Sequence, residues 1–333
     1  MLGLLILKQR ADEAALHPTR RLGSEAMQTA YITHPYCFKH EMIAGHPECP
    51  ARLTAIEDQL KSAGLFDFLV HYEAPKASAA ELARVHDTRH IHEILSRSPK
   101  RGLVYVDPDT CMNPYTALAA LRAAGSAVLA AELVTSGKVS NAFCCVRPPG
   151  HHCERGEAMG FCFFNNVAVG VAHALAHCDV DRIAVVDFDV HHGNGTEDIF
   201  EEETRVLVCS AYQHPLYPYS GRPTVNGHLV NVPLEAGSGS QEFRHAVKAH
   251  WMPQLERFQP QMIFISAGFD AHHEDDMAEL NLTEADFAWV TRQIMAIAAA
   301  YAEGRIVSLL EGGYALHALG RSVAAHVRTL MGV

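Results

Sequence analysis

What the sequence lacks excludes several classes of protein. The N-terminal segment MLGLLILKQR (1–10) holds an apolar run of only six residues, too short for the core of a signal peptide. No later stretch approaches the ~20 apolar residues of a membrane span. No Lys-Ser/Thr follows the Gly193-Asn194-Gly195 turn, and no strand-GxGxxG-helix unit occurs, so we do not expect nucleotide binding. No repeat or Pro/Gly/Ser-rich linker divides the chain.

Positive charge and paired cysteines are also scarce. The 27 Lys and Arg residues stand against 38 Asp and Glu, a formal net charge of −11, which argues against a general nucleic-acid binder. An acidic surface would attract cationic substrates instead. The nine cysteines form no CxxC, and a chain of 333 residues buries a large core without disulfides. We therefore expect reduced thiols in a soluble, cytoplasmic protein.

Short apolar, β-branched runs alternate with longer segments of helical spacing. We expect strands at Ala30–Thr33, Phe143–Val146, Ile183–Phe188, Val206–Ser210, Met262–Ala267 and Ile306–Leu310. We expect helices at Pro114–Ser136, Asn165–His177, Gln241–Phe258, Thr283–Ala302 and His317–Met331. This alternation predicts an α/β fold with a single open, mostly parallel sheet flanked by helices. Residues 27–333 would form one domain. Residues 1–26 would be an appendage, explained by an upstream start or by a poorly ordered arm.

Residues that carry chemistry follow the predicted strands. The chain holds 22 histidines, and four of the last five predicted strands end in clusters of His, Asp, Gly or Tyr. The clusters read RPPGHH (147–152), DVHHGNG (189–195), AGFDAHH (267–273) and EGGY (311–314). Open parallel sheets bind ligands beyond the carboxyl ends of their strands. We therefore predict a single active site at that edge of the sheet.

The pattern Asp187-Phe188-Asp189-Val190-His191 is typical of a metal site. Alternate residues of an extended segment share a face, and two carboxylates with an imidazole would be poorly solvated there without a cation. Asp270, after the next strand-like run, would be a third ligand. Three protein ligands and a water are the arrangement of catalytic zinc, although Fe²⁺ or Co²⁺ also fits one nitrogen with oxygen ligands. The alternative is an Asp–His hydrogen-bonded pair without metal.

Two further motifs provide acid–base and electrophilic groups. His151 and His152 stand at the tip of a turn that two prolines and a glycine make rigid. Neighbouring imidazoles spread each other's pKa values, so one can act as a base and one as an acid. Asp187 could bond one imidazole and set its tautomer. Tyr314, after two glycines, could donate a hydrogen bond to a developing oxyanion.

The aromatic run GFCFFNN (160–166) has two interpretations. Core packing explains most of it. One of its rings could instead line an apolar channel to the site.

Several long motifs resemble those of one enzyme family. HPECPARL (46–53), RPPGHH, GFCFFNN, VVDFDVHHGNGT (185–196), SAGFDAHH (266–273) and LEGGYAL (310–316) resemble the zinc-dependent histone deacetylase superfamily. The order and spacing of the motifs agree from about residue 30 to the C-terminus. The RPPGHH form, Asn194 and LEGGY look like the class II branch and its bacterial relatives, the histone deacetylase-like amidohydrolases and acetylpolyamine amidohydrolases. The class I branch carries Asp where Asn194 stands.

The resemblance implies roles for individual residues. The zinc ligands would be Asp189, His191 and Asp270, and the catalytic residues His151, His152 and Tyr314, with Asp187 and Asn194 bonded to the two histidines. The substrate channel would include Gly160, Phe161, Met277 and Tyr217, where the family usually has Phe for the last. Arg52 would lie near the exit cavity and Asp109 at the rim. A potassium ion would be held by the Asp187 carboxylate, the carbonyls of Asp189, His191 and Ala211, and Ser210.

The resemblance further implies hydrolysis of an N-acyl amide of a lysine-like amine, in a small molecule or a peptide. Polyamine-selective members place a Glu seven residues after the last zinc ligand, and this chain has Met277 there. Glu274 and Asp275 lie close enough in sequence to weaken that distinction, so an acetylpolyamine amidohydrolase is the alternative. An arginase-type enzyme would need a further carboxylate where Gly193 stands, and a binding module without activity would have lost a ligand or Tyr314. The sequence leaves open whether the chain forms a homo-oligomer.

Overall fold

The computed structural model describes residues 28–221, 224–225 and 227–333, so the predicted appendage at 1–26 lies outside the described residues. Within these residues the chain builds a nine-stranded sheet in the order β2-β1-β5-β11-β10-β6-β7-β9-β8. The strands are β1 (Thr29–Thr33), β2 (Val70–Glu73), β5 (Asn141–Cys144), β6 (Ile183–Asp187), β7 (Val206–Gln213), β8 (Thr224–Val225), β9 (Leu229–Leu234), β10 (Met262–Ala267) and β11 (Ile306–Leu310). All neighbours pair in parallel except β8, which is antiparallel to β9. The predicted α/β fold with a mostly parallel sheet is confirmed.

The strand predictions hold best where a strand is apolar throughout. β10 and β11 have the predicted bounds, whereas β5 begins and ends earlier and β7 continues to Gln213. The strand β7 is longer because its last residues pair with β9, as far as Gln213 opposite Leu234. The sequence did not predict β2, β8, β9 or the hairpin of β3 (Val104–Tyr105) and β4 (Cys111–Met112). β2 lies at the sheet edge with its residues half-buried or exposed, and Asn231 and Pro233 interrupt the apolar run of β9.

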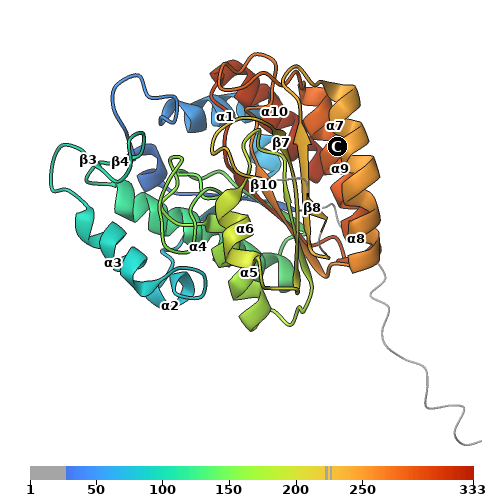
Figure 1. Cartoon of the computed structure of the whole chain (residues 1–333), viewed down its shortest axis with the longest axis horizontal. Helices are drawn as coiled ribbons and strands as arrows, with labels where there is room; N and C mark the ends of the chain where they lie inside the picture. The colour runs from blue at the N-terminus through green and yellow to red at the C-terminus, as the bar shows by residue number, and fades with distance from the viewer. Residues whose placement is uncertain (1–27, 222–223, 226) are drawn as a thin grey trace, which may run out of the picture.

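Helices cover both faces of the sheet (Figure 1). On one side α4 (Thr116–Thr135) packs against β1, β5 and β11, and α5 (Asn166–His177) packs against β6 and β10. The other layer contains α1 (Ala51–Ser62), α7 (Ser240–Ala246), α8 (Met252–Phe258), α9 (Glu284–Tyr301) and α10 (Leu316–Leu330). Short helices complete the described chain: α2 (Ala79–Leu82), α3 (Thr88–Arg97), α6 (Asn194–Phe200) and the 3₁₀ turns Pro35–Phe38 and Phe66–Phe68.

Each predicted helix is present with its ends shifted by at most two residues, whereas α1, α2, α3 and α6 were not predicted. The helix predicted at Gln241–Phe258 consists of α7, a π-helical turn at Val247–Trp251 and α8. Asn165, which we had expected to be the first residue of a helix, is the cap of α5, and its side chain accepts a hydrogen bond from the backbone N–H of Ala168. Capping by a side-chain oxygen satisfies one of the N–H groups that a helix leaves free at its start.

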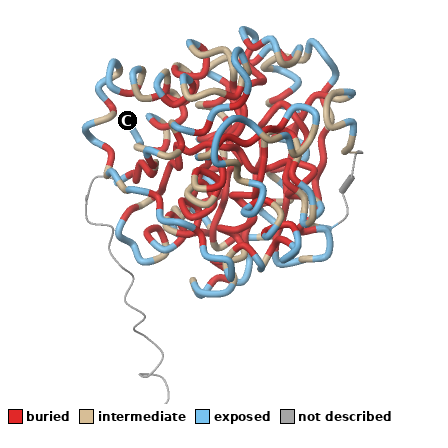
Figure 2. Tube along the Cα trace, turned by 90° about the vertical axis from the view of Figure 1, so that its left-hand side faces the viewer, coloured by how far each residue is buried: buried red, intermediate tan, exposed pale blue. Residues whose placement is uncertain are grey.

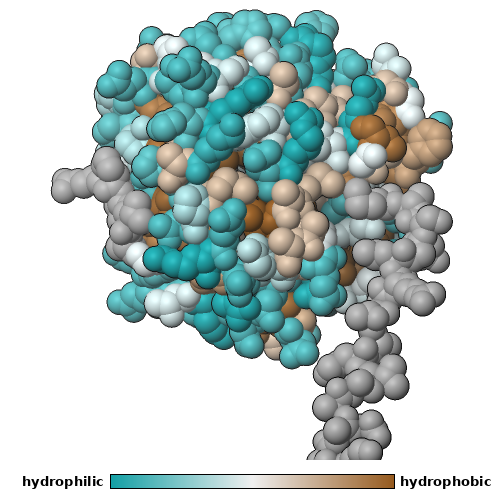
Figure 3. Space-filling model, turned by 90° about the vertical axis from the view of Figure 1, so that its right-hand side faces the viewer, coloured by the Kyte–Doolittle hydropathy of each residue, from teal (hydrophilic) through white to brown (hydrophobic). Residues whose placement is uncertain are grey.

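The core lies along the central strands. Every residue of β5, β6, β7, β10 and β11 is buried, as expected for strands covered on both faces. Figure 2 shows the buried residues concentrated in the interior and the exposed residues at the outside. Hydrophilic residues cover most of the face seen in Figure 3, with hydrophobic residues in small groups. We expect no membrane span from the sequence, yet α4 is long and apolar enough to cross a membrane by length and composition. However, 72% of its most apolar window is buried inside the molecule.

Gly170 provides a test of this packing. It lies inside α5, where Ala would normally favour the helix by ~1 kcal/mol. A Cβ on Gly170 would meet the Cβ of Ala127 at 2.7 Å and a ring carbon of Phe264 at 2.8 Å. Because overpacking costs ~1–3 kcal/mol, we expect Gly170→Ala to lower the free energy of unfolding, measured by urea denaturation. Gly239→Ala is the control, since its Cβ would find no atom closer than 3.6 Å. A higher urea midpoint for Gly170→Ala would contradict the packing.

Candidate active site

The predicted clusters meet at one edge of the sheet. The strands that precede them, β5, β11, β10 and β6, are neighbours in that order. Because the strands are parallel, their carboxyl ends deliver the loops at 147–152, 187–195, 267–273 and 311–314 to the same place. The strand β6 ends at Asp187, one residue before the predicted end, so Asp189 and His191 lie on the loop and not on an extended strand.

The three predicted metal ligands converge. The Nδ1 atom of His191 lies 3.0 Å from Oδ1 of Asp189 and 3.2 Å from Oδ2 of Asp270. One ligand atom from each residue falls within 4.8 Å of the others, and all three side chains are buried. Oδ2 of Asp270 has no hydrogen-bond donor. A buried carboxylate oxygen without a donor is costly, and a cation among these atoms would satisfy it. The residues therefore fit a metal ion.

Backbone groups fix the two carboxylates. Oδ2 of Asp189 accepts a hydrogen bond from the N–H of Gly312 at 2.8 Å, and Oδ1 of Asp270 accepts one from the N–H of Val190 at 3.0 Å. A Cβ on Gly312 would lie 2.0 Å from Oδ2 of Asp270, and a Cβ on Gly268 would lie 2.1 Å from Oδ2 of Asp189. Only glycine at 268 and 312 leaves room for the carboxylates.

Each of the tandem histidines has the partner that the resemblance implied. Nδ1 of His151 lies 3.0 Å from Oδ2 of Asp187, and Nδ1 of His152 lies 2.8 Å from Oδ1 of Asn194. The two ring centroids are 4.0 Å apart. Burial opposes protonation of His151, but the carboxylates of Asp189 and Asp187 raise its pKa well above the usual value. Burial and the neighbouring imidazoles His151 and His191 lower the pKa of His152. The two histidines therefore lie in different electrostatic environments, and their division into acid and base stays a prediction.

Glu311 anchors the histidine turn, a role that the sequence analysis missed. Its Oε2 accepts hydrogen bonds from the N–H groups of Gly150 at 2.7 Å and His151 at 3.2 Å. Burial raises the pKa of Glu311 to about 7. The only sequence signal was its place in EGGY, directly before two flexible glycines.

Tyr314 stands over a buried charge network. The guanidinium of Arg52 lies 4.8 Å from the centre of its ring and donates to the carbonyls of Gly313 and Glu311. Arg52 and Arg147 both bond Glu48, and all three side chains are fully buried. Arg147 lowers the pKa of Glu48 despite the burial of this carboxyl. Glu48 and Arg147 lie in the motifs HPECPARL and RPPGHH, but nothing in those motifs predicts this network.

Asp275 and Glu274 already form hydrogen bonds or ion pairs within the protein. Oδ2 of Asp275 accepts from the backbone N–H of Tyr314 at 2.6 Å and of Ala315 at 2.9 Å. Its Oδ1 accepts from the N–H of Met277 at 3.1 Å, which links the half-buried Met277 to the tyrosine loop. Glu274 is exposed and pairs with Arg321. Neither carboxylate is free in the way that the polyamine alternative would need.

Aromatic rings surround the histidines. Tyr217 meets His152 edge-on at 5.2 Å between centroids, and Phe161 meets Tyr314 at 6.1 Å. Phe161 has φ +68°, a left-handed conformation rare outside glycine, and its N–H donates to Thr110. A Cβ on Gly160 would lie 2.5 Å from the ring of His152, so this loop packs directly on the imidazole. The interpretation that one ring of GFCFFNN faces the site agrees with these contacts.

Fewer contacts support the roles of the remaining predicted site residues. Ser210 lies opposite Asp187 in the pairing of β6 and β7, and its buried Oγ has no hydrogen-bond partner, as an oxygen ligand of a second cation would. Ala211 follows it in β7. The potassium site stays a prediction. Asp109 lies in the turn between β3 and β4, and partial desolvation of its carboxyl and the neighbouring Asp107 raise its pKa to about 6.

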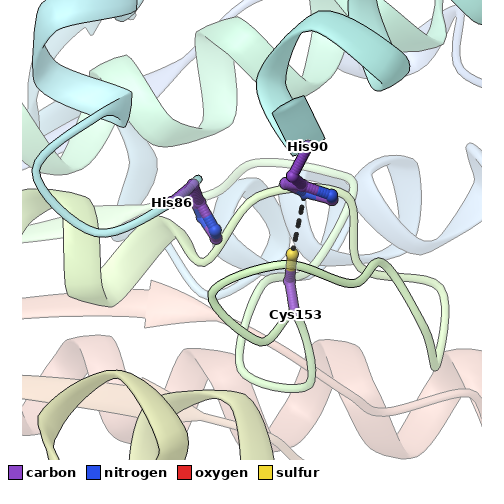
Figure 4. Close-up of side chains that lie close together, drawn as sticks. All are labelled: His86, His90 and Cys153. Atoms are coloured by element: carbon purple, nitrogen blue, oxygen red, sulfur yellow. Dashed lines mark hydrogen bonds between the residues drawn. The ribbon is translucent and has the colours of Figure 1, made fainter. Parts of the chain in front are cut away.

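A second buried cluster of possible metal ligands lies behind the histidine turn. His86, His90 and Cys153 point toward one another (Figure 4). Nδ1 of His86 bonds the carbonyl of Glu154, and its Nε2 accepts from the backbone N–H of Asn165. Both nitrogens of His86 are therefore occupied by the backbone, and burial raises the pKa of the Cys153 thiol. These three residues support the turn and leave no free lone pair on His86 for a metal. A third group, His272, His273 and Glu274, is partly exposed.

The chain is similar to known deacetylases. Residues 46–330 match the histone deacetylase domain. The histone deacetylase-like amidohydrolase of Pseudomonas aeruginosa is 38% identical over 278 residues, which is 81% of this chain and 73% of that protein. The mouse polyamine deacetylase HDAC10 is 35% identical, over 92% of this chain and 48% of that protein. The crystal structure of the HDA15 HD domain matches with a TM-score of 0.86 and 34% identity, over 92% of this chain and 88% of that chain.

Gly312 tests the metal-binding geometry. We expect Gly312→Ala to lose most of its bound metal, because the new methyl group would displace the carboxylates of Asp270 and Asp189. Metal content after dialysis against zinc is the measurement, with circular dichroism to show that the fold is retained. Gly156→Ala is the control, because its Cβ would meet only side-chain atoms, Oδ2 of Asp87 at 3.2 Å and a guanidinium nitrogen of Arg89 at 4.0 Å. Full metal content in Gly312→Ala would show that the ion binds elsewhere.

Proposed function

Because this chain belongs to the histone deacetylase family, we propose that it hydrolyses N-acetyl and other short N-acyl amides of lysine-like amines, releasing the free amine and a short carboxylate. The observation that carries the proposal is the convergence of Asp189, His191 and Asp270 beside two histidines that are each bonded at Nδ1. The substrate would be a small molecule or a peptide, and the enzyme cytoplasmic, with no nucleic acid or membrane as partner.

Asp189, His191 and Asp270 would hold the catalytic metal, which we propose to be Zn²⁺, with Fe²⁺ or Co²⁺ also suited to one nitrogen and oxygen ligands. When bound, the ion supplies Lewis-acid polarisation of the amide carbonyl and of a water. Asp187, Ser210 and the carbonyls of Asp189, His191 and Ala211 would hold K⁺. The orphaned Oγ of Ser210 supports this assignment.

The protein's own groups would divide the proton transfers. Oδ1 of Asn194 accepts a hydrogen bond from Nδ1–H of His152. The lone pair at Nε2 of His152 is therefore free to take a proton from the attacking water. His151, bonded to Asp187, would give a proton to the departing amine. The hydroxyl of Tyr314 would donate to the oxygen of the amide carbonyl as negative charge develops there. Phe161 and Tyr217 would flank the acyl-amine stem, with Gly160 allowing close approach to His152.

A comparison of two substrates tests the proposal. With zinc-loaded enzyme we expect a higher kcat/KM for an acetyl-lysine peptide than for N-acetylputrescine, and loss of both activities after chelation. His152→Ala should lower kcat by about 10²–10⁴-fold, because general base catalysis is removed. The exposed His92→Ala is the control. A preference for N-acetylputrescine would support the acetylpolyamine amidohydrolase, and unchanged turnover of His152→Ala would refute the assigned role.

Met277 tests the choice between these substrates. We expect Met277→Glu to raise kcat/KM for N-acetylputrescine relative to the acetyl-lysine peptide by about tenfold, since a half-buried carboxylate would attract the second ammonium. Met277→Gln has a similar shape without the charge and serves as the control. An equal shift in both variants would exclude an electrostatic cause.

A further inference from the structure

The hydrogen bond between His152 and Asn194 is ambiguous by itself. A side-chain amide can present either its oxygen or its NH₂ group to an imidazole, and each choice selects a different tautomer. With Oδ1 of Asn194 at 2.8 Å from Nδ1 of His152, the ring proton lies on Nδ1 and Nε2 keeps its lone pair. A flipped amide would donate to Nδ1 and leave the proton on Nε2, where no base would remain. A carboxylate at position 194 could only accept and would not have this ambiguity.

The surroundings of the NH₂ group of Asn194 remove the ambiguity. Nδ2 of Asn194 donates to Oε1 of Glu154 at 2.7 Å. The sulfur of Met159 at 3.3 Å and the carbonyl of His152 at 3.4 Å are weaker acceptors on the same side. A carboxylate anion accepts and cannot donate, so a flipped Asn194 would set its carbonyl oxygen against the Glu154 oxygen. Repulsion between the two oxygens disfavours the flip.

Glu154 is itself held in place. Its backbone N–H donates to the carbonyl of Glu157 at 3.0 Å, and its carbonyl accepts from Nδ1 of His86 at 3.1 Å. His86 belongs to the buried cluster behind the turn (Figure 4). The side chain of Glu154 is half-buried, so its bond to Asn194 is partly shielded from water. A charge-assisted hydrogen bond in such a place is short, strong and polarising.

We propose that Glu154 is a positioning residue that fixes the amide of Asn194 and thereby keeps the ring proton of His152 on Nδ1. The chain His152–Asn194–Glu154 places the carboxylate one residue further from the imidazole than a carboxylate at position 194 would. Glu154 touches neither substrate nor metal in this proposal. Its effect on catalysis rests on the proposed function, whereas its effect on the tautomer does not.

The tautomer is measured directly by ¹⁵N NMR of the histidine rings in zinc-loaded enzyme, with His152→Gln identifying the His152 signals. We expect the Nδ1–H tautomer in the wild type and a mixture of both tautomers in Glu154→Gln, because Gln can either donate or accept. Glu157→Gln is the matched control, since it removes a nearby charge from an exposed side chain without a bond to Asn194. An unchanged His152 spectrum in folded Glu154→Gln would overturn the proposal.

Kinetics provide the second readout. We expect Glu154→Gln to lower kcat by about tenfold on the acetyl-lysine peptide with KM unchanged, a typical effect of losing an outer partner of a catalytic group. The double variant Glu154→Gln with Asn194→Asp restores an acceptor at Nδ1 and should recover kcat, which a loss of folding would not allow. Failure of this recovery, or a rise in KM alone, would overturn the proposal. Absence of turnover in the wild type would refute the proposed function, and the NMR result would still decide the role of Glu154.

Discussion

The burial of several carboxylates at one edge of the sheet is the constraint on which the site depends. Asp187 is the last residue of β6, Asp189 and Asp270 lie in the loops that follow the neighbouring strands β6 and β10, and all three are almost fully buried. Isolated buried charges of this kind cost several kcal/mol each, so every oxygen needs a donor or a cation. Backbone N–H groups and imidazoles supply most of the donors. Oδ2 of Asp270 is left without one, beside the imidazole of His191, which is where a metal ion fits.

The parallel sheet makes this concentration of charge geometrically possible. Adjacent strands end at the same edge, and the loop that follows each strand can offer its own N–H groups to the carboxylate of the next. Gly312 contributes to the position of two of these carboxylates. Its N–H holds Asp189, and its missing side chain makes room for Asp270. Glu311, one residue earlier, holds the histidine turn from the end of the neighbouring strand.

The number of histidines alone does not show which of them belong to the active site and which only pack in the core. His326 lies in α10, is fully buried, and bonds Thr291 and Ser308 with its two ring nitrogens. Burial lowers its pKa to about 3. His86 likewise has both nitrogens taken by the backbone. Whether an imidazole is free to act depends on which groups surround it, and these come from distant parts of the chain.

Much was predictable from local pattern. The apolar runs predicted the central strands because strands covered on both faces must be apolar throughout, and the clusters after them predicted the edge where the site lies. The motifs around His151 and Asp189 were sufficient to indicate the family. Only the tertiary structure showed that Asp275 holds the backbone of Tyr314 and that Glu154 holds the amide of Asn194. These single carboxylates belong to no repeating pattern. Their partners are set by loops that meet only when the sheet forms, since hydrogen bonding acts over about 3 Å and not along the sequence.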